Sequence, residues 1–133
     1  MTRDDIVAAP LAGRTIGALD GDFVVAEWSD AGETSRDWPI APLHVHHRDD
    51  EAWYVLEGTL GFRLGDDEVE VGAGSAVFAP RGVPHTFWNA GPGEARYLLV
   101  MSTRIARLIE ELHSGAGQDP DAVFRTYESD LLR

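Results

Sequence analysis

The chain reads Pro42-Leu43-His44-Val45-His46-His47-Arg48-Asp49-Asp50-Glu51 over its first histidine-rich segment. Residues i and i+2 of a β-strand point to the same side, so His44 and His46 can present their imidazoles to one ion. Val45 would point the other way, and residues 47–50 give the chain room to turn. We therefore expect Glu51 to return on the next strand, so that one hairpin-like unit supplies three metal ligands.

A second segment, residues 74–89, supplies a fourth residue of the same kind. It reads Gly-Ser-Ala-Val-Phe-Ala-Pro-Arg-Gly-Val-Pro-His-Thr-Phe-Trp-Asn, and its histidine is His85. Pro80 and Pro84 stiffen the loop that delivers this histidine. Three neutral imidazoles and one carboxylate suit Mn, Fe, Co, Ni, Cu or Zn, whereas Ca and Mg prefer oxygen ligands. The two segments together predict a site for a transition metal.

The spacing of these residues resembles a known family. The segments follow the pattern His-x-His-x4-Glu-x6-Gly and then Gly-x5-Pro-x-Gly-x2-His-x3-Asn, which closely resembles the two-motif signature of the cupin superfamily. The resemblance covers about the central half of the chain, from Pro42 to about Met101. It implies an antiparallel jelly-roll barrel, also called a double-stranded β-helix, and one divalent transition metal per chain. The ligands that it implies are His44, His46, Glu51 and His85.

His47 directly follows the ligand pair. If the strand continues, this side chain points to the opposite face from His46. We therefore interpret His47 as a surface residue, or as a neighbour of the ligands, and not as a ligand itself.

Length and composition predict one small domain. The 133 residues are enough for one core and too few for two ordinary domains. The absence of cysteine excludes disulfides and thiolate ligands and fits a reducing compartment. No signal-peptide pattern opens the chain, and its longest strongly apolar run, residues 97–101, is far below the roughly 20 residues that span a bilayer. We expect a soluble, cytoplasmic protein.

The net charge of the chain indicates which classes of partner it can bind. The chain has 23 acidic and 11 basic residues, a formal net charge of −12. Nucleic acids and anionic membranes are bound by basic surfaces. We expect neither of these partners, and expect a small-molecule substrate or ligand instead.

Most of the chain has the pattern of short strands. Branched and aromatic residues gather in segments that glycine and proline separate, which is typical of an all-β sandwich or barrel. The expected strands are residues 22–28, 52–56, 59–64, 68–71, 76–78, 85–89 and 95–102.

The C-terminal part changes to a helical pattern. Apolar residues recur at helical spacing in residues 104–113, after Ser102 and Thr103, which can cap a helix. Asp119 and Pro120 similarly predict the start of a second helix over residues 120–132. We expect residues 1–102 to form the barrel with an N-terminal arm, and residues 103–133 to form a helical extension that packs on the same domain. A lid or a dimer contact is the alternative role of these helices.

Alternation along the strands predicts which side chains surround the metal. Trp53 and Val55 share a face with Glu51, and Phe87 and Asn89 share one with His85. Phe62 and Phe78 are further candidates for the wall of this pocket, although each aromatic could equally serve the core. An apolar, aromatic pocket around a metal suits a small organic substrate.

Two kinds of chemistry fit such a site. The resemblance favours a dioxygenase-like enzyme of the quercetinase type, in which a redox-active metal activates dioxygen or a chelated substrate. The alternative is a non-redox isomerase or polyketide-cyclase-like enzyme, in which the metal polarises a carbonyl. Glu51 is a ligand and a possible catalytic base in either scheme. Other possible proton carriers are His47, Glu57 and Tyr97.

A non-enzymatic, ligand-binding cupin is the third alternative, because such barrels also serve as binding domains. The helices at the end of the chain are too few and too mixed in charge for a DNA-binding unit. The resemblance also implies a homodimer, formed by strand exchange or by sheet packing, with the N-terminal segment as the candidate exchanging arm.

Overall fold

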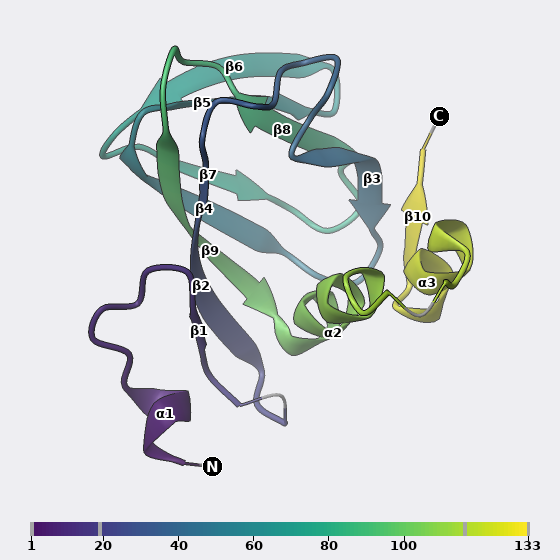
Figure 1. Cartoon of the computed structure of the whole chain (residues 1–133). Helices are drawn as coiled ribbons and strands as arrows, with labels where there is room; N and C mark the ends of the chain where they lie inside the picture. Colours follow the sequence, from purple (N-terminus) through teal and green to yellow (C-terminus); the bar gives the residue numbers. More distant parts are fainter. Residues whose placement is uncertain (1, 19, 116, 133) are drawn as a thin grey trace.

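Two antiparallel sheets pack face to face (Figure 1). The computed structural model describes residues 2–18, 20–115 and 117–132, and within these residues each sheet has five strands. The first sheet has the order β1 (Thr15–Ile16), β2 (Phe23–Asp30), β9 (Ala95–Ser102), β4 (Glu51–Glu57) and β7 (Ala76–Ala79). The second has the order β10 (Ser129–Leu131), β3 (Ala41–His46), β8 (His85–Asn89), β5 (Thr59–Leu64) and β6 (Asp67–Gly72).

The core lies between the two sheets. Along β9 buried and more exposed residues alternate, as expected for a strand with one face on the core. Leu99 and Trp53 enter the core from the first sheet, and Leu60, Phe62 and Phe87 enter it from the second. Full burial of an apolar side chain of this size contributes about 1.5–3 kcal/mol, so this layer is the main stabilising feature of the sandwich.

The expected all-β jelly-roll fold is confirmed. All seven expected strands form, and their ends agree with the prediction to within two residues. The strand that carries His44 and His46 also forms, as β3. The two edge strands β1 and β10 were not expected, because each is too short to show a pattern of its own.

The expectation of a hairpin-like unit is wrong. Strand β3 pairs with β8 and β10, whereas β4 pairs with β7 and β9, so residues 47–50 carry the chain from one sheet to the other. The inner faces of β3 and β4 cover the same core from opposite sides. The ligands on these two strands therefore approach each other across the sandwich, and not along one sheet.

Two helices cover one end of the sandwich, beside β3 and β10 (Figure 1). Helix α2 (Thr103–Leu112) begins after Ser102, whose side chain accepts a hydrogen bond from the Ile105 backbone N–H, as the sequence predicts. Helix α3 (Pro120–Thr126) begins after Asp119, which caps it in the same way. A short helix α1 (Arg3–Ile6) lies near the N-terminus. None of the helices within the described ranges is long and apolar enough to span a membrane.

The prediction of a helix over residues 120–132 is wrong in its second half. Helix α3 ends at Thr126, Glu128 adopts a left-handed backbone with φ 54°, and residues 129–131 form β10. The backbone groups of β10 pair with β3, which satisfies them as well as a further helical turn would. Of the segments expected from the sequence, Met1, Ala116 in the linker between the helices, and Arg133 lie outside the described residues.

Candidate metal centre

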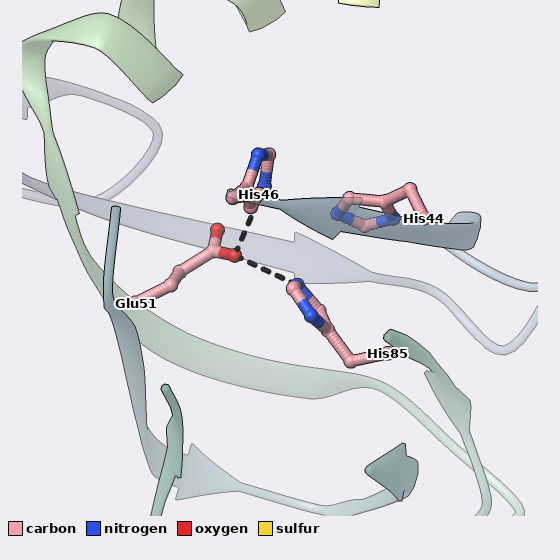
Figure 2. A group of neighbouring side chains, drawn as sticks. All are labelled: His44, His46, Glu51 and His85. Atoms are coloured by element: carbon pink, nitrogen blue, oxygen red, sulfur yellow. Dashed lines mark hydrogen bonds and ion pairs between the residues drawn. The ribbon is translucent and has the colours of Figure 1, made fainter. Parts of the chain in front are cut away.

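Four side chains of the two sequence segments converge at one end of the core (Figure 2). Each offers one ligand atom, and these atoms all lie within 4.8 Å of one another. His44 and His46 come from β3, Glu51 is the first residue of β4, and His85 is the first residue of β8. All four are buried, with at most 6% of each residue exposed. The structure thus brings together all four residues that the sequence predicts as ligands.

The ring nitrogens that point away from the cluster hold the imidazoles in place. The Nδ1 atom of His44 lies 2.6 Å from the carbonyl oxygen of Pro42, and Nδ1 of His85 lies 3.0 Å from that of Val83. A carbonyl oxygen only accepts hydrogen bonds, so in both rings Nδ1 carries the proton and donates it. In a ring that carries only this proton, Nε2 keeps its lone pair for a metal ion.

The distances around Glu51 provide a test of whether the cluster suits a cation. Its Oε1 atom lies 3.0 Å from Nε2 of His85 and 3.6 Å from Nε2 of His46. When Nδ1 of His85 carries the only proton of the ring, Nε2 and the carboxylate both present lone pairs at this distance. Two acceptors repel each other unless a second proton or a metal ion lies between them. The donor set therefore fits a divalent transition metal.

Burial and mutual proximity shift the ionisation of the cluster. Burial, together with the neighbouring His85 and His46, lowers the pKa of His44 from 6.5 to about 3. Burial alone would raise the pKa of Glu51, but its contacts with His46 and His85 outweigh this effect and lower it from 4.5 to about 2. At neutral pH the cluster accordingly contains a carboxylate and a neutral His44, the protonation states that bind metals.

Contacts outside the cluster connect the loop that follows β3 with the loop that precedes β8. The backbone N–H of Gly82 donates to the carbonyl oxygen of His46 at 2.7 Å. Asp50 accepts from the backbone N–H of Arg81 at 2.9 Å and forms an ion pair with its guanidinium at 3.2 Å. These contacts fix the loop before His85 against the loop that follows β3.

A cavity of about 200 Å³ lies next to the cluster and reaches His44 and Glu51. Its walls are mainly aromatic and aliphatic side chains of both sheets, and residues of α2 and α3 cover it. The lining residues include Trp53, Phe87 and Tyr97 from the sheets, Leu108 from α2, His113 at its end, and Phe124 from α3. No lysine or arginine is among the lining residues found in the described part of the chain.

The predicted pocket residues lie in three different environments. Trp53 and Phe87 line the cavity, as expected. Val55 and Phe62 are fully buried in the core and do not line it, because they lie deeper between the sheets. Their expected role in the pocket is therefore not seen.

Phe78 and Asn89 do not line this cavity. Phe78 is 57% exposed, because its neighbours Val77 and Ala79 take the inward positions of β7. Asn89 does face inward, but it lies four residues from His85, about 13 Å along the strand. Its amide donates to the carbonyl oxygen of Gly93 at 2.7 Å, so it stabilises the turn between β8 and β9.

The three possible proton carriers also lie in different places. His47 lies on the surface, as predicted, and contacts Asp130 at 2.8 Å. Glu57 is also exposed and pairs with Arg96. Only Tyr97 lines the cavity, and burial, with the charges of Asp30 and Glu51, raises the pKa of its hydroxyl, so it stays protonated. Residues of α2 and α3 also line the cavity. A lid is one alternative role expected for these helices from the sequence, but the sequence does not indicate which of their residues face the site.

Fold and cluster together define a jelly-roll β-protein with a buried site that could hold a metal. Residues 37–101 match the family model described as cupin domain. The chain therefore belongs to the cupin family, as a small cupin-domain protein, and the resemblance noted in its sequence is confirmed.

Several relatives share this region. The uncharacterized protein SCO3923 of Streptomyces coelicolor is 33% identical over 73 residues, 55% of this chain and 62% of that protein. The solved structure of the polyketide cyclase RemF from Streptomyces resistomycificus has 31% identity and a TM-score of 0.52, and covers 74% of this chain and 62% of RemF. TT1209 from Thermus thermophilus has 29% identity and a TM-score of 0.52, covering 61% of this chain and 72% of TT1209. The chain thus spans less than two thirds of SCO3923 and of RemF.

Proposed function

We propose that this protein is a metal-dependent enzyme that acts on a small, uncharged, oxygen-bearing organic compound. The observation that carries the proposal is the position of the four buried ligand residues at the end of an apolar cavity of about 200 Å³. A cavity of about 150 Å³ lined by apolar side chains accommodates benzene. A substrate with one substituted ring fits this size better than a three-ring flavonol does.

The charge of the cavity supports an uncharged substrate. The described lining residues include no lysine or arginine, and His113 at the end of α2 is the one lining side chain besides His44 that can become cationic. A phosphate or a dicarboxylate would lose its hydration in this apolar cavity without a fixed cation to replace it. A carbonyl or hydroxyl compound avoids this cost.

Non-redox chemistry of the polyketide-cyclase type is the first candidate. The likeness to RemF, at 31% identity over 74% of this chain, favours it. A bound metal would supply a Lewis acid that polarises a carbonyl oxygen. Trp53 and Phe87 would form the aromatic wall against which a ring packs, and α2 and α3 would exclude water. Tyr97 would donate a hydrogen bond from its protonated hydroxyl, and a carboxylate oxygen of Glu51 would accept a proton from the substrate.

Dioxygenase-like chemistry is the second candidate. Three imidazoles and one carboxylate bind Fe, Mn, Ni and Cu as well as Zn, so the ligand set suits a redox metal equally. The closed, apolar surroundings of the cluster would protect reactive intermediates from water. The choice between the two candidates therefore depends on which metal is bound.

The test is metal reconstitution followed by substrate screening. Protein without an affinity tag would be freed of metal and loaded separately with Zn, Co, Mn, Fe, Ni or Cu. We expect one metal per chain and metal-dependent conversion of neutral phenolic or keto compounds, with oxalate and sugar phosphates as anionic controls. Dioxygen uptake would favour the dioxygenase, and turnover without it the cyclase or isomerase. Binding without turnover would leave a ligand-binding protein, and failure to bind any metal would contradict the proposal.

We also propose that two copies of the chain associate through the outer face of the first sheet. This face presents Phe23, Tyr54 and Phe78, which are 61%, 43% and 57% exposed, together with Val100. Aromatic side chains bury about 150–250 Å² each, so the exposed parts of these three offer roughly 300 Å². A stable interface needs roughly 800 Å² per partner, so partly exposed neighbours such as Leu98 would have to contribute the rest.

The strand order makes this face self-complementary. Phe23 lies on β2 and Phe78 on β7, on opposite sides of β9 and β4. A twofold axis that lies in the interface, parallel to the strands and over β9 and β4, would place Phe23 of one chain near Phe78 of the other, as an isologous interface requires. Sheet packing is therefore our proposal for the homodimer, in preference to strand exchange.

A further inference from the structure

The last strand of the described chain lies directly beside the strand that carries two of the candidate ligands. Strand β10 pairs with β3 so that Ser129 is opposite His46 and Leu131 is opposite His44. Two backbone hydrogen bonds extend this pairing: the N–H of His47 donates to Glu128 at 3.0 Å, and that of Leu132 donates to Leu43 at 3.0 Å. Strand β3 is thus held between β8, which carries His85, and β10 (Figure 1).

The side chain of Ser129 contacts a candidate ligand. Its residue is only 2% exposed, and its Oγ lies 2.7 Å from Nδ1 of His46. The same Oγ donates its proton to the carbonyl oxygen of Tyr127 at 3.1 Å. A hydroxyl has one proton, so Oγ must accept from the ring, and Nδ1 of His46 must carry a proton. This leaves the lone pair on Nε2, which is the atom that faces Glu51.

The three histidines differ in which part of the chain accepts the hydrogen bond from Nδ1 and so sets the tautomer of the ring. His44 and His85 donate to carbonyl oxygens two residues earlier in the chain, so the local backbone sets their tautomers. His46 depends on a residue 83 positions away, in a different element. The hydrogen bond that fixes Nδ1 of His46 therefore forms only when β10 is docked.

We infer that Ser129 is a positioning residue of the metal site, and that metal binding and the docking of the C-terminal strand stabilise each other. This inference rests on the proposed function in one respect, because it takes the four-residue cluster to be the metal site. Its physical basis is that a ring nitrogen fixed by a hydrogen bond leaves the other nitrogen free to bind the ion. Since such coupling is reciprocal, a metal ion that gains affinity from Ser129 must stabilise β10 by the same factor.

The first measurement needs no metal and compares native protein with Ser129→Ala. The ¹⁵N chemical shifts of the histidine rings in metal-free protein report which nitrogen carries the proton. We expect His46 to be protonated at Nδ1 in the native protein, and to lose this preference in Ser129→Ala. A serine with a purely structural role would leave the His46 tautomer unchanged in that variant, and this result would overturn the inference.

The second measurement is zinc affinity by chelator competition. We expect Ser129→Ala to weaken zinc binding by about 10–100-fold, the effect typical of removing the partner of a metal ligand. Ser129→Thr keeps the hydroxyl and should restore most of the affinity. The matched control is Asp130→Asn on the same strand, which removes the negative charge from an exposed contact with His47 and should change the affinity by less than about threefold.

The third measurement is hydrogen exchange with and without zinc. We expect zinc to slow exchange of the Leu132 and His47 amide protons in the native protein, and to do so less in Ser129→Ala. If native protein binds no metal, the proposed function fails, while the tautomer measurement still decides the role of Ser129. If zinc binds equally to native protein and Ser129→Ala, and the amides do not respond, the inference fails and the proposed function stands.

Discussion

Glu51 and His85 belong to opposite sheets, yet Oε1 of Glu51 lies 3.0 Å from Nε2 of His85. The cluster therefore joins the two layers of the sandwich at one end of the core. A metal ion bound to both residues would connect the sheets directly, so its binding energy would add to the stability of the fold.

Removing one ligand should weaken the metal site without unfolding the protein. We expect His44→Ala or His85→Ala to reduce bound metal at least about tenfold, because each takes one of four donors from the ion. The core aromatic residues remain in place, so circular dichroism should still show a β-rich fold. Metal content would be measured by elemental analysis of dialysed protein.

The control for this experiment is His47→Ala. Its side chain is 49% exposed and contacts Asp130, so we expect the metal content to remain as in the native protein. Unchanged metal content in both ligand variants would show that the cluster is not the binding site.

The stability of metal-free protein should rise with pH between about 2 and about 6.5. Burial, with the nearby His85 and His46, lowers the pKa of His44 from 6.5 to about 3, so between these values the unfolded chain binds the proton and the folded chain does not. Glu51 acts in the same direction, because its pKa is lowered from 4.5 to about 2 and its stabilising contribution is present above 4.5. Whenever the unfolded state binds more protons, unfolding becomes easier as the pH falls.

Urea denaturation in the presence of a chelator, from pH 3 to pH 8, would measure this dependence. The variant His44→Asn, which has no titrating ring, should show a smaller slope between pH 4 and pH 6.5. A native protein whose unfolding free energy is flat over that interval would contradict the lowered pKa of His44.

The close packing of Gly61 on β5 predicts that a larger residue there lowers stability. A Cβ atom at Gly61 would overlap the indole of Trp88, which is buried on the neighbouring strand β8. We expect Gly61→Ala to lower the free energy of unfolding by about 1–3 kcal/mol, the usual cost of overpacking. At Gly93 a Cβ would meet no atom within 4 Å, so Gly93→Ala is the matched control and should change stability by less than about 0.5 kcal/mol. Equal thermal stability of the two variants would contradict the close contact.

Local geometry predicts only one pair of the cluster, His44 and His46. Glu51 and His85 were identified as ligands through the resemblance to cupins, because the expected hairpin does not form. His44 and His46 share a face of one strand, and alternation alone is enough to pair them. Ser129 could not be found in this way, because it reaches His46 only after the chain has formed both sheets and two helices. Long-range contacts of this kind leave no periodic signal in the sequence.

Two other differences between the sequence predictions and the structure have equally specific causes. Strand β7 has apolar residues on both faces, so alternation cannot decide whether Phe78 or Val77 points inward. Leu131 fits the apolar stripe of a helix, and in the folded protein it still packs near Val123 and Phe124, but it does so from a strand. Pairing with β3 decided the backbone conformation there, and the side-chain pattern did not.

The proposed homodimer can be tested at the centre of its interface. We expect Tyr54→Arg, alone or with Phe78→Glu, to convert the dimer into a monomer, because each change would bury a charge in an apolar interface. Analytical ultracentrifugation over a range of protein concentrations would measure the association. Trp38→Glu is the control, because Trp38 is 79% exposed but lies outside the sheet, so this variant should remain dimeric. A native protein that stays monomeric at high concentration would contradict the proposed interface, and dissociation by Trp38→Glu alone would place the contact on a different surface.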